Sequence, residues 1–385
     1  MYSNFIGVLS MKQHLKNIDF PLFAIIFLLS LFGLVMVYSA SFVYAGLDEN
    51  INNPAYFFNR QRLWLIVGFI IFFIASLFSY RKLGQMIPLL IIITLILLIA
   101  VFIPGIGVDV KGAKRWINLG PIPFLIQPSE LAKITMLLYF AKVYTNKRDQ
   151  LHDFGKGVLP PLIILTFVFG LIVLQPDLGT ATTILIACGI ILLFAGIRLI
   201  HLLALGTLAI GAVVLLIFTA DYRMDRLTSF MDPFADPSGD GYQLIHSLIA
   251  IASGEVTGVG LANSVQKSGF LPEAHTDFIM AVIAEELGLI GVLFVIVLYM
   301  AFMYKGILIA KRAPDQFGKI LALGITFQIV SQAIINMGAV SGLLPITGIT
   351  LPLVSYGGSS MLITFVLLGL LMNIAIKGNI KRREV

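Results

Sequence analysis

The segment 265–279 brings four titratable side chains to the start of an apolar stretch: Lys267, Glu273, His275 and Asp277. The whole chain is 58% hydrophobic and only 12% charged, with a mean hydropathy of +0.98. Because apolar surroundings shift pKa values, a titratable cluster in such a chain predicts a chemical site. The alternative is that Thr276 or Asp277 only caps a helix, since Thr and Asp are common N-cap residues.

A second candidate cluster is basic and aromatic. It lies in the segment 104–127 and consists of Lys111, Lys114, Arg115 and Trp116. Three cations beside an aromatic ring can bind a pyrophosphate and its sugar, because hydrogen bonds between cationic side chains and phosphate are strong. The alternative is a membrane-surface role, in which the Trp anchors at the headgroup level and the cations contact lipid phosphates. The sequence is compatible with both interpretations.

A third candidate is a glycine pair within the segment 336–361. Gly357 and Gly358 precede Ser359 at the start of an apolar stretch. Successive backbone N–H groups at a helix N-terminus form an anion site. The alternative is a re-entrant turn that needs glycine for close packing, and this interpretation also stays open.

Long apolar stretches separate these clusters and predict an all-α polytopic membrane protein with about ten transmembrane helices. A helix needs about 20 apolar residues to cross the hydrocarbon core. The predicted spans are 21–45, 63–79, 86–103, 131–144, 158–174, 178–197, 199–220, 278–304, 320–340 and 361–376. The fourth lengthens if Pro128, Ser129 and Glu130 form its first turn, because Pro and acidic residues favour helix starts. We expect a single domain over residues 1–385.

The distribution of Lys and Arg predicts that both termini are cytoplasmic. Seventeen of the 26 basic residues lie in segments expected inside, eight lie in segments expected outside, and Lys133 lies within a span. This orientation makes 1–17 a cytoplasmic segment, 377–385 a basic cytoplasmic tail, and 221–276 a large extracytoplasmic loop between helices 7 and 8. The formal charge of +6 thus reflects membrane topology, and no nucleic-acid partner is expected. The single cysteine, Cys188, excludes an internal disulfide and a Cys-based metal site.

Helical geometry indicates that Asp277 heads a packed face if the eighth helix begins there. Four small residues then fall within about 40° of it at 100° per residue: Ala281, Ala284, Gly288 and Gly291. Small residues let another helix approach closely. Glu285 and Glu286 lie roughly 12 Å deeper. Carboxylates at that depth need a partner, such as Lys133, or a polar cavity.

Six motifs along the chain resemble the bacterial SEDS family (shape, elongation, division and sporulation), whose type members are FtsW and RodA. They are KGAKRWINLG at 111–120, IQPSELAK at 126–133, QPDLGT at 175–180, LPEAHTDFI at 271–279, AEELG at 284–288 and LPLVSYGGSS at 351–360. They occur in the family's order over about 19–377. The stretches GITLPL at 348–353 and EAHTD at 273–277 look more like the FtsW-like division and sporulation branch than the elongation branch.

The resemblance implies a peptidoglycan glycosyltransferase of the bacterial cytoplasmic membrane that polymerises lipid II on the outer face. It places the family's essential aspartate on Asp277, the catalytic candidate, and its loop tryptophan on Trp116. The substrate-binding candidates are Lys111, Lys114, Arg115, Trp116, Lys133, Gln175, Asp177, Arg223, Arg226, Lys267, Glu273, His275, Ser355, Gly357, Gly358 and Ser359. His275 either tunes Asp277 or has a structural role. A divalent cation, Mg or Mn, can assist the pyrophosphate, and its ligands are unknown.

The implied partners are lipid II, undecaprenyl-pyrophosphate-linked glycan, membrane lipids and a class B penicillin-binding transpeptidase. The apolar run 244–252 within the loop 221–276 predicts a surface for the membrane, the other helices or a bound protein. Two other functions stay open. A lipid II flippase would use a site near the membrane midplane, where Glu285 and Glu286 are expected. A non-catalytic scaffold would only recruit or activate a transpeptidase.

Overall fold

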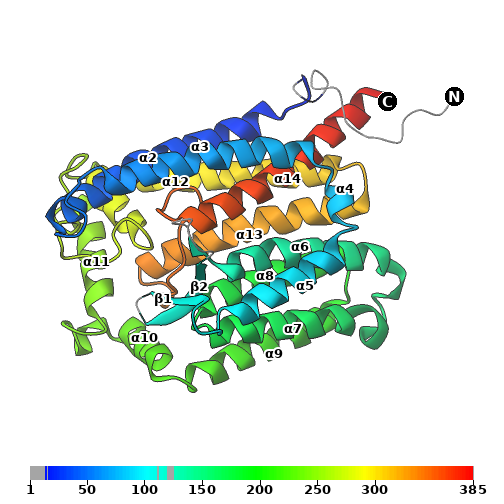
Figure 1. Cartoon of the computed structure of the whole chain (residues 1–385), viewed down its shortest axis with the longest axis horizontal. Helices are drawn as coiled ribbons and strands as arrows, with labels where there is room; N and C mark the ends of the chain where they lie inside the picture. The colour runs from blue at the N-terminus through cyan, green and yellow to red at the C-terminus, as the bar shows by residue number, and fades with distance from the viewer. Residues whose placement is uncertain (1–13, 15, 111, 119–124, 385) are drawn as a thin grey trace.

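The computed structural model describes residues 14, 16–110, 112–118 and 125–384 (Figure 1). Eight helices of this part are long and apolar enough to cross a membrane. They are α2 (Phe20–Leu47), α3 (Tyr56–Leu77), α7 (Leu159–Leu174, preceded by the π-helical turn η2, Phe154–Val158), α8 (Leu178–Ala195), α9 (Leu199–Ile217), α12 (Ile279–Arg312), α13 (Gln316–Val340) and α14 (Gly358–Glu384). The shorter α5 (Ile87–Ala100) and the more polar α6 (Pro128–Asn146) correspond to the other two predicted spans. The prediction of an all-α polytopic protein is confirmed.

The helices run side by side along the long axis of the molecule (Figure 1). α14 packs against α3, α12 lies between α13 and α2, and α13 also contacts α8. The beginning of α2 and the end of α14 lie at one end of the bundle, and α10 (Asp221–Met231) and α11 (Tyr242–Gly254) lie at the other (Figure 1). We call the end with α10 and α11 the loop end.

Local sequence accounts for several helix starts. Asp19 accepts a hydrogen bond from the N–H of Leu22 (3.1 Å) at the start of α2, and Asp177 accepts one from Thr180 (3.3 Å) at the start of α8. α6 begins at Pro128 with Glu130 in its first turn, as predicted. An acceptor at the N-cap satisfies an N–H that has no partner within the helix.

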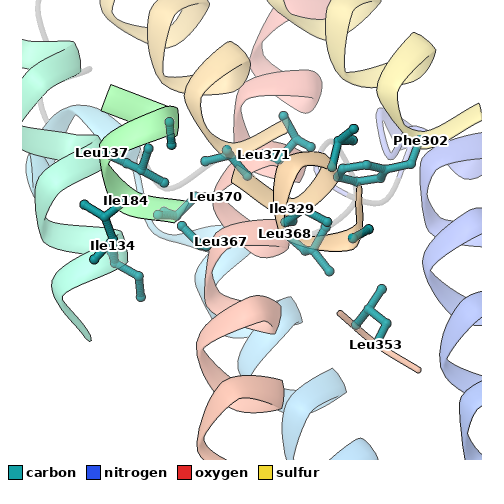
Figure 2. Packing of buried hydrophobic residues seen from close by; sticks show 14 of the residues in the cluster. Ile134, Leu137, Ile184, Phe302, Ile329, Leu353, Leu367, Leu368, Leu370 and Leu371 are labelled. Atoms are coloured by element: carbon teal, nitrogen blue, oxygen red, sulfur yellow. The ribbon is translucent and has the colours of Figure 1, made fainter. Parts of the chain in front are cut away.

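The apolar core is centred on α14. Figure 2 shows side chains of α6, α8, α12 and α13 gathered around its leucines, among them Leu367 and Leu371. Lipid tails are as apolar as leucine, so close packing and polar contacts hold these helices together rather than removal from water. One such polar contact is donated by Asn373 Nδ2 to the carbonyl oxygen of Ser76 (2.6 Å), which joins α14 to α3.

The connection between α12 and α13, at the end opposite the loop end, is organised by Asp315. Its carboxylate accepts hydrogen bonds from the Gly318 N–H (2.7 Å), the Tyr80 hydroxyl (2.8 Å) and Arg81 Nε (2.6 Å). Tyr80 and Arg81 belong to the short helix α4 (Tyr80–Leu83). Burial raises the pKa of Asp315, but these hydrogen bonds outweigh it, and its pKa lies below the usual value.

A small antiparallel sheet was not expected from the sequence. It consists of β1 (Gly107–Val110), β2 (Ala113–Asn118) and β3 (Leu125–Ile126), in the order β1-β2-β3. Gly112, with φ of +76°, occupies the turn between β1 and β2. Backbone groups that leave a helix near the membrane still need hydrogen-bond partners, and the ribbon supplies them.

The eighth span differs from the predicted helix at two points. α12 begins at Ile279, two residues after Asp277, and it is broken at Gly288 (φ 63°, ψ −160°). Ala281, Ala284, Gly288 and Gly291 are nevertheless all buried, as the small-residue stripe predicted.

The segment 255–260 crosses the break in α12. The N–H groups of Val259 and Gly260 donate to the carbonyls of Glu285 and Glu286 (2.9 and 3.0 Å). Those of Leu289 and Ile290 donate to the carbonyls of Glu255 and Val256 (3.0 and 3.3 Å). The crossing segment thus satisfies the backbone groups that the break releases, which is the condition for irregular backbone at this depth.

Candidate active site

Asp277 lies half-buried in the turn before α12, at the loop end. Asn336 Nδ2 donates to its backbone carbonyl (2.7 Å) and to that of Ile349 (2.8 Å), which ties the turn to α13 and to the segment before α14. The backbone of Gly348 lies against the carboxylate, because a Cβ there would sit 3.5 Å from Asp277 Oδ2. The N-cap of α12 is Phe278, so neither Thr276 nor Asp277 occupies that position.

The residues just before Asp277 are held by packing and by backbone contacts. The ring of His275 lies 4.3 Å from the Phe57 ring and 5.9 Å from the Tyr44 ring, and its carbonyl accepts from the Tyr356 N–H (2.9 Å). Thr276 donates its hydroxyl to Glu273 Oε2 (2.6 Å). These contacts favour the structural alternative for His275.

Arg226 interacts electrostatically with Asp277 and with Arg115, which comes from a distant part of the chain. Arg115, on β2, donates to the carbonyls of Gln175 (3.2 Å) and Pro176. Arg226, on α10, donates to the carbonyl of Ile346 (3.3 Å). Burial lowers the pKa of Arg226 and the charge of Arg115 lowers it further, whereas Asp277, Tyr222 and Asp177 oppose that shift. Arg226 therefore shares one electrostatic environment with Arg115 and Asp277.

The other described members of the predicted basic cluster are exposed or half-buried. Lys114 is exposed on β2, Trp116 is half-buried opposite Val108, and Lys111 lies outside the described residues. Arg223 donates to the carbonyls of Leu216 (2.9 Å) and Val173 (3.2 Å). The guanidinium of Arg223 thus joins the ends of α9 and α7.

The QPDLGT motif forms a buried joint between helices. Gln175 Nε2 donates to the carbonyl of Leu98 in α5 (2.8 Å). Asp177 Oδ2 accepts from Gln127 Nε2 (2.9 Å) and from Ser129 Oγ (3.0 Å) at the start of α6. Both predicted residues are almost fully buried, so these contacts indicate a structural role for their side chains.

Two predicted lysine ligands are buried in ion pairs instead. Lys133 Nζ contacts Glu130 Oε1 (2.8 Å) and Gln332 Oε1 (3.0 Å). Lys267 Nζ contacts Glu286 Oε1 (2.5 Å) and Ser39 Oγ (3.2 Å), and its side chain is 1% exposed.

These placements correct two expectations. Lys267 has no surface on which to meet a phosphate, because its charge is directed into the bundle. Lys133 does not pair with either deep carboxylate. Glu286 has Lys267 and Ser39, and Glu285 accepts from the N–H groups of Val265 and Gln266 (2.9 and 3.4 Å) and from the Ser264 hydroxyl.

The segment before α14 holds the turn of Asp277 rather than forming an open anion cradle. Ser355 donates its hydroxyl to the Thr276 carbonyl (2.6 Å). Ser359 accepts from the Gln127 N–H (3.3 Å). A Cβ on Gly358 would lie 2.8 Å from Trp64 Cε2, which supports the close-packing interpretation there. A Cβ on Gly357 would lie 3.6 Å from its nearest neighbour, so close packing does not require glycine there.

Comparison with known proteins identifies the family. The sequence pattern of the FtsW/RodA/SpoVE family, described as a cell cycle protein family, matches residues 20–380. The chain belongs to this family. Stage V sporulation protein E of Bacillus subtilis is 41% identical over 357 residues, which cover 93% of this chain and 96% of that protein. A probable peptidoglycan glycosyltransferase FtsW of Trichlorobacter lovleyi is 41% identical over 368 residues, 96% of each chain.

Solved structures of FtsW/RodA proteins have the same fold. A chain from a peptidoglycan synthase complex, described for its coordination of polymerization and crosslinking, gives a TM-score of 0.76 at 30% identity and covers 93% of this chain and 97% of that one. RodA of Thermus thermophilus gives 0.67 at 26% identity, covering 97% and 98%. The resemblance predicted from the six motifs is therefore confirmed, as is a multi-pass protein of the cytoplasmic membrane.

The described part of this FtsW/RodA chain holds no cluster of metal-ligating side chains. No group of three or more His, Cys, Asp or Glu side chains there is arranged to hold a metal ion. Carboxylates and carbonyls are the ligands that Mg²⁺ and Mn²⁺ prefer. Mg²⁺ is usually held by one or two carboxylates together with substrate phosphates, so the assisting cation stays a prediction, and no step below depends on it.

Sequence reasoning missed three polar residues of this FtsW/RodA site: Ser39, Gln127 and Asn336. Ser39 lies on α2 and bonds to Glu286, and Gln127 precedes α6 and bonds to Asp177. Asn336 lies on α13 and bonds to the Asp277 carbonyl. A buried amide or hydroxyl in an apolar span is costly without a partner. A polar residue in an apolar span is therefore expected to have a hydrogen-bond partner, but the sequence does not identify that partner.

Proposed function

We propose that this chain is a peptidoglycan glycosyltransferase that polymerises lipid II at the outer face of the membrane, with Asp277 as the general base. The observation that carries the proposal is the position of the Asp277 carboxylate at the loop end, in one electrostatic environment with Arg226 and Arg115. Relatives that are about 40% identical over nearly their whole length are named peptidoglycan glycosyltransferases, which supports the reaction class. The Lys and Arg distribution supports the outer placement.

The reaction requires a base and positive charge. A sugar hydroxyl of one lipid II attacks the anomeric carbon of the lipid-linked growing chain and forms the new glycosidic C–O bond. Asp277 accepts the proton of that hydroxyl as the bond forms. The bond between the anomeric carbon and the pyrophosphate oxygen breaks, and undecaprenyl pyrophosphate leaves with the electron pair. Arg115 and Arg226 stabilise the negative charge that develops on it.

Replacement of Asp277 by Asn tests this assignment. Asn keeps the shape of the side chain and removes its basicity, so the purified variant should be folded and should not polymerise lipid II. Polymerisation at the parent rate by Asp277→Asn would exclude Asp277 as the base. Asp221→Asn is the matched control, because it neutralises an exposed carboxylate at the start of α10 and leaves Asp277 intact.

The transport alternative has less support in this structure. Glu285 and Glu286 were the carboxylates expected near a midplane site. Both already accept hydrogen bonds from buried residues of the chain. A transported substrate would have to displace these contacts.

For the partner, we propose a class B penicillin-binding transpeptidase bound at the loop end and along α12. A chain with this fold occurs in a solved peptidoglycan synthase complex. Phe234, in the turn η3 (Pro233–Ala235), is 67% exposed, and Ile290 on α12 is 61% exposed. Site-specific crosslinking from both positions should capture the transpeptidase. If it stimulates polymerisation but is never captured there, it binds another surface.

A further inference from the structure

A hollow of about 330 Å³ opens beside the candidate active site and has no role in the mechanism above. One wall is a single face of α10, because Tyr222, Asp225, Arg226 and Ser229 follow the three- and four-residue spacing of neighbours on a helix. The other wall is formed by residues 239–243 before and at the start of α11. Pro272 and Ile346 complete the lining.

The lining offers both hydrogen-bond donors and hydrogen-bond acceptors. The carboxylates of Asp225 and Asp240 have no ion pair within the described residues and can only accept. Arg226 uses Nη1 for the Ile346 carbonyl and keeps further N–H donors. Gln243 donates to the Pro272 carbonyl (3.4 Å), which leaves its own side-chain oxygen as an acceptor.

This mixture favours a neutral, hydroxyl-rich ligand. A phosphate would meet Asp225 and Asp240, and an ammonium group would meet Arg226, so either would face a like charge. Sugar hydroxyls both donate and accept, and can therefore bond to carboxylates and guanidinium together. Tyr222 and Tyr242 add aromatic surface for the apolar faces of a sugar ring. The volume lies at the lower end of the range for small-molecule sites.

The hollow adjoins the reacting groups. Arg226 lines the hollow and also interacts electrostatically with Asp277. Pro272 lies five positions before Asp277 in the chain. Ile346 lies two positions before Gly348, where a Cβ would lie 3.5 Å from Asp277 Oδ2. A chain of sugars with its reacting end at Asp277 can thus extend into the hollow.

We propose that this hollow is a saccharide subsite that holds a sugar unit of the glycan away from the bond being formed. The inference rests on the proposed glycosyltransferase function and adds a product-holding site to it. Holding the strand between successive couplings keeps it from dissociating, so the subsite sets the length of the glycan. Asp225, Asp240 and Tyr242 are its specificity-determining residues.

The test combines direct binding with glycan length. The variants are Asp225→Asn and Tyr242→Ala in the full-length chain, and the control is Asp221→Asn, on the same helix but outside the hollow. Binding of the tetramer of N-acetylglucosamine to purified protein is measured by calorimetry. Loss of one hydrogen bond to a charged group should weaken binding about tenfold or more. Glycans made from lipid II should become shorter in both variants and stay unchanged in the control.

The outcomes separate the subsite from the reaction itself. Tetramer binding and glycan lengths equal to the parent in both variants would overturn the subsite. Unchanged tetramer binding with weaker capture of the transpeptidase would also overturn it, because the hollow would then be a protein-docking surface. A parent protein that binds the tetramer but makes no glycan from lipid II would refute the proposed function and leave the saccharide site standing.

Discussion

Lys267→Met should destabilise the protein by leaving a buried charge without its partner. Lys267 and Glu286 are 1% and 0% exposed, and their charged atoms lie 2.5 Å apart. Lys267 Nζ also lies 4.7 Å from the centre of the Phe42 ring. Met keeps most of the length and apolar volume of Lys and removes only the charged group. The variant therefore isolates the electrostatic part of the contact.

The expected loss is about 3 kcal/mol. Removal of one partner from a buried ion pair costs about 3–5 kcal/mol, because the remaining charge is left in an apolar environment. The lower end applies here, since Glu286 keeps two hydrogen-bond contacts with the Ser39 hydroxyl (2.8 and 2.6 Å). Lys267→Met combined with Glu286→Gln should recover most of this loss, because a neutral amide can still bond to Ser39. A double-mutant cycle measures the coupling between the two sites.

Thermal stability and polymerisation kinetics together decide between a pairing role and a phosphate-binding role. The single variant should lose folded protein at a lower temperature than the parent, and the double variant should regain stability and activity. Lys82→Met is the control, because Lys82 is exposed on α4, at the end opposite the loop end. A stable Lys267→Met protein with a raised KM for lipid II, not rescued by Glu286→Gln, would refute this reasoning and restore Lys267 as a substrate ligand.

Three further predictions concern other parts of the chain. Arg115→Ala should raise the apparent KM for lipid II about tenfold or more, since hydrogen bonds between a guanidinium and a phosphate are strong. An unchanged KM would show that the basic cluster reflects membrane topology and does not bind the substrate. Gly258→Ala should lower thermal stability while Gly170→Ala does not, because Gly258 has φ of +79° and its Cβ would lie 2.1 Å from the Glu286 carbonyl oxygen, whereas Gly170 faces open space. Equal stability of these two variants would show that the backbone of the segment 255–260 shifts to accommodate a Cβ at position 258 without loss of stability. The pKa of Asp315 is depressed, so its stabilising contribution is complete above its usual pKa of 3.8 and is lost as the pH falls through the lower folded-state value. The stability difference between the parent and Asp315→Asn should therefore be constant near neutral pH and vanish in acid; a difference that does not shrink as the pH falls below 3.8 would contradict this assignment.

The sequence by itself determined the class of protein and the segment that carries the candidate base. Apolar runs specify membrane helices because a chain in lipid must satisfy its backbone groups internally. Pro128 and Glu130 marked the start of α6 correctly, since helix starts depend on neighbouring residues. The small residues after Asp277 predicted a packed face for the same local reason.

Only the tertiary structure decided which charges meet. Arg115 and Asp277 are both far from Arg226 in the sequence, yet both act electrostatically on it in the fold. Lys267 looked like a phosphate ligand in the sequence, and in the fold it neutralises Glu286. The break at Gly288 depends on the segment 255–260, which supplies the missing backbone partners. Hydrophobicity and helix capping are local properties of a chain, whereas the partner of a buried charge is set by whichever distant segment packs against it.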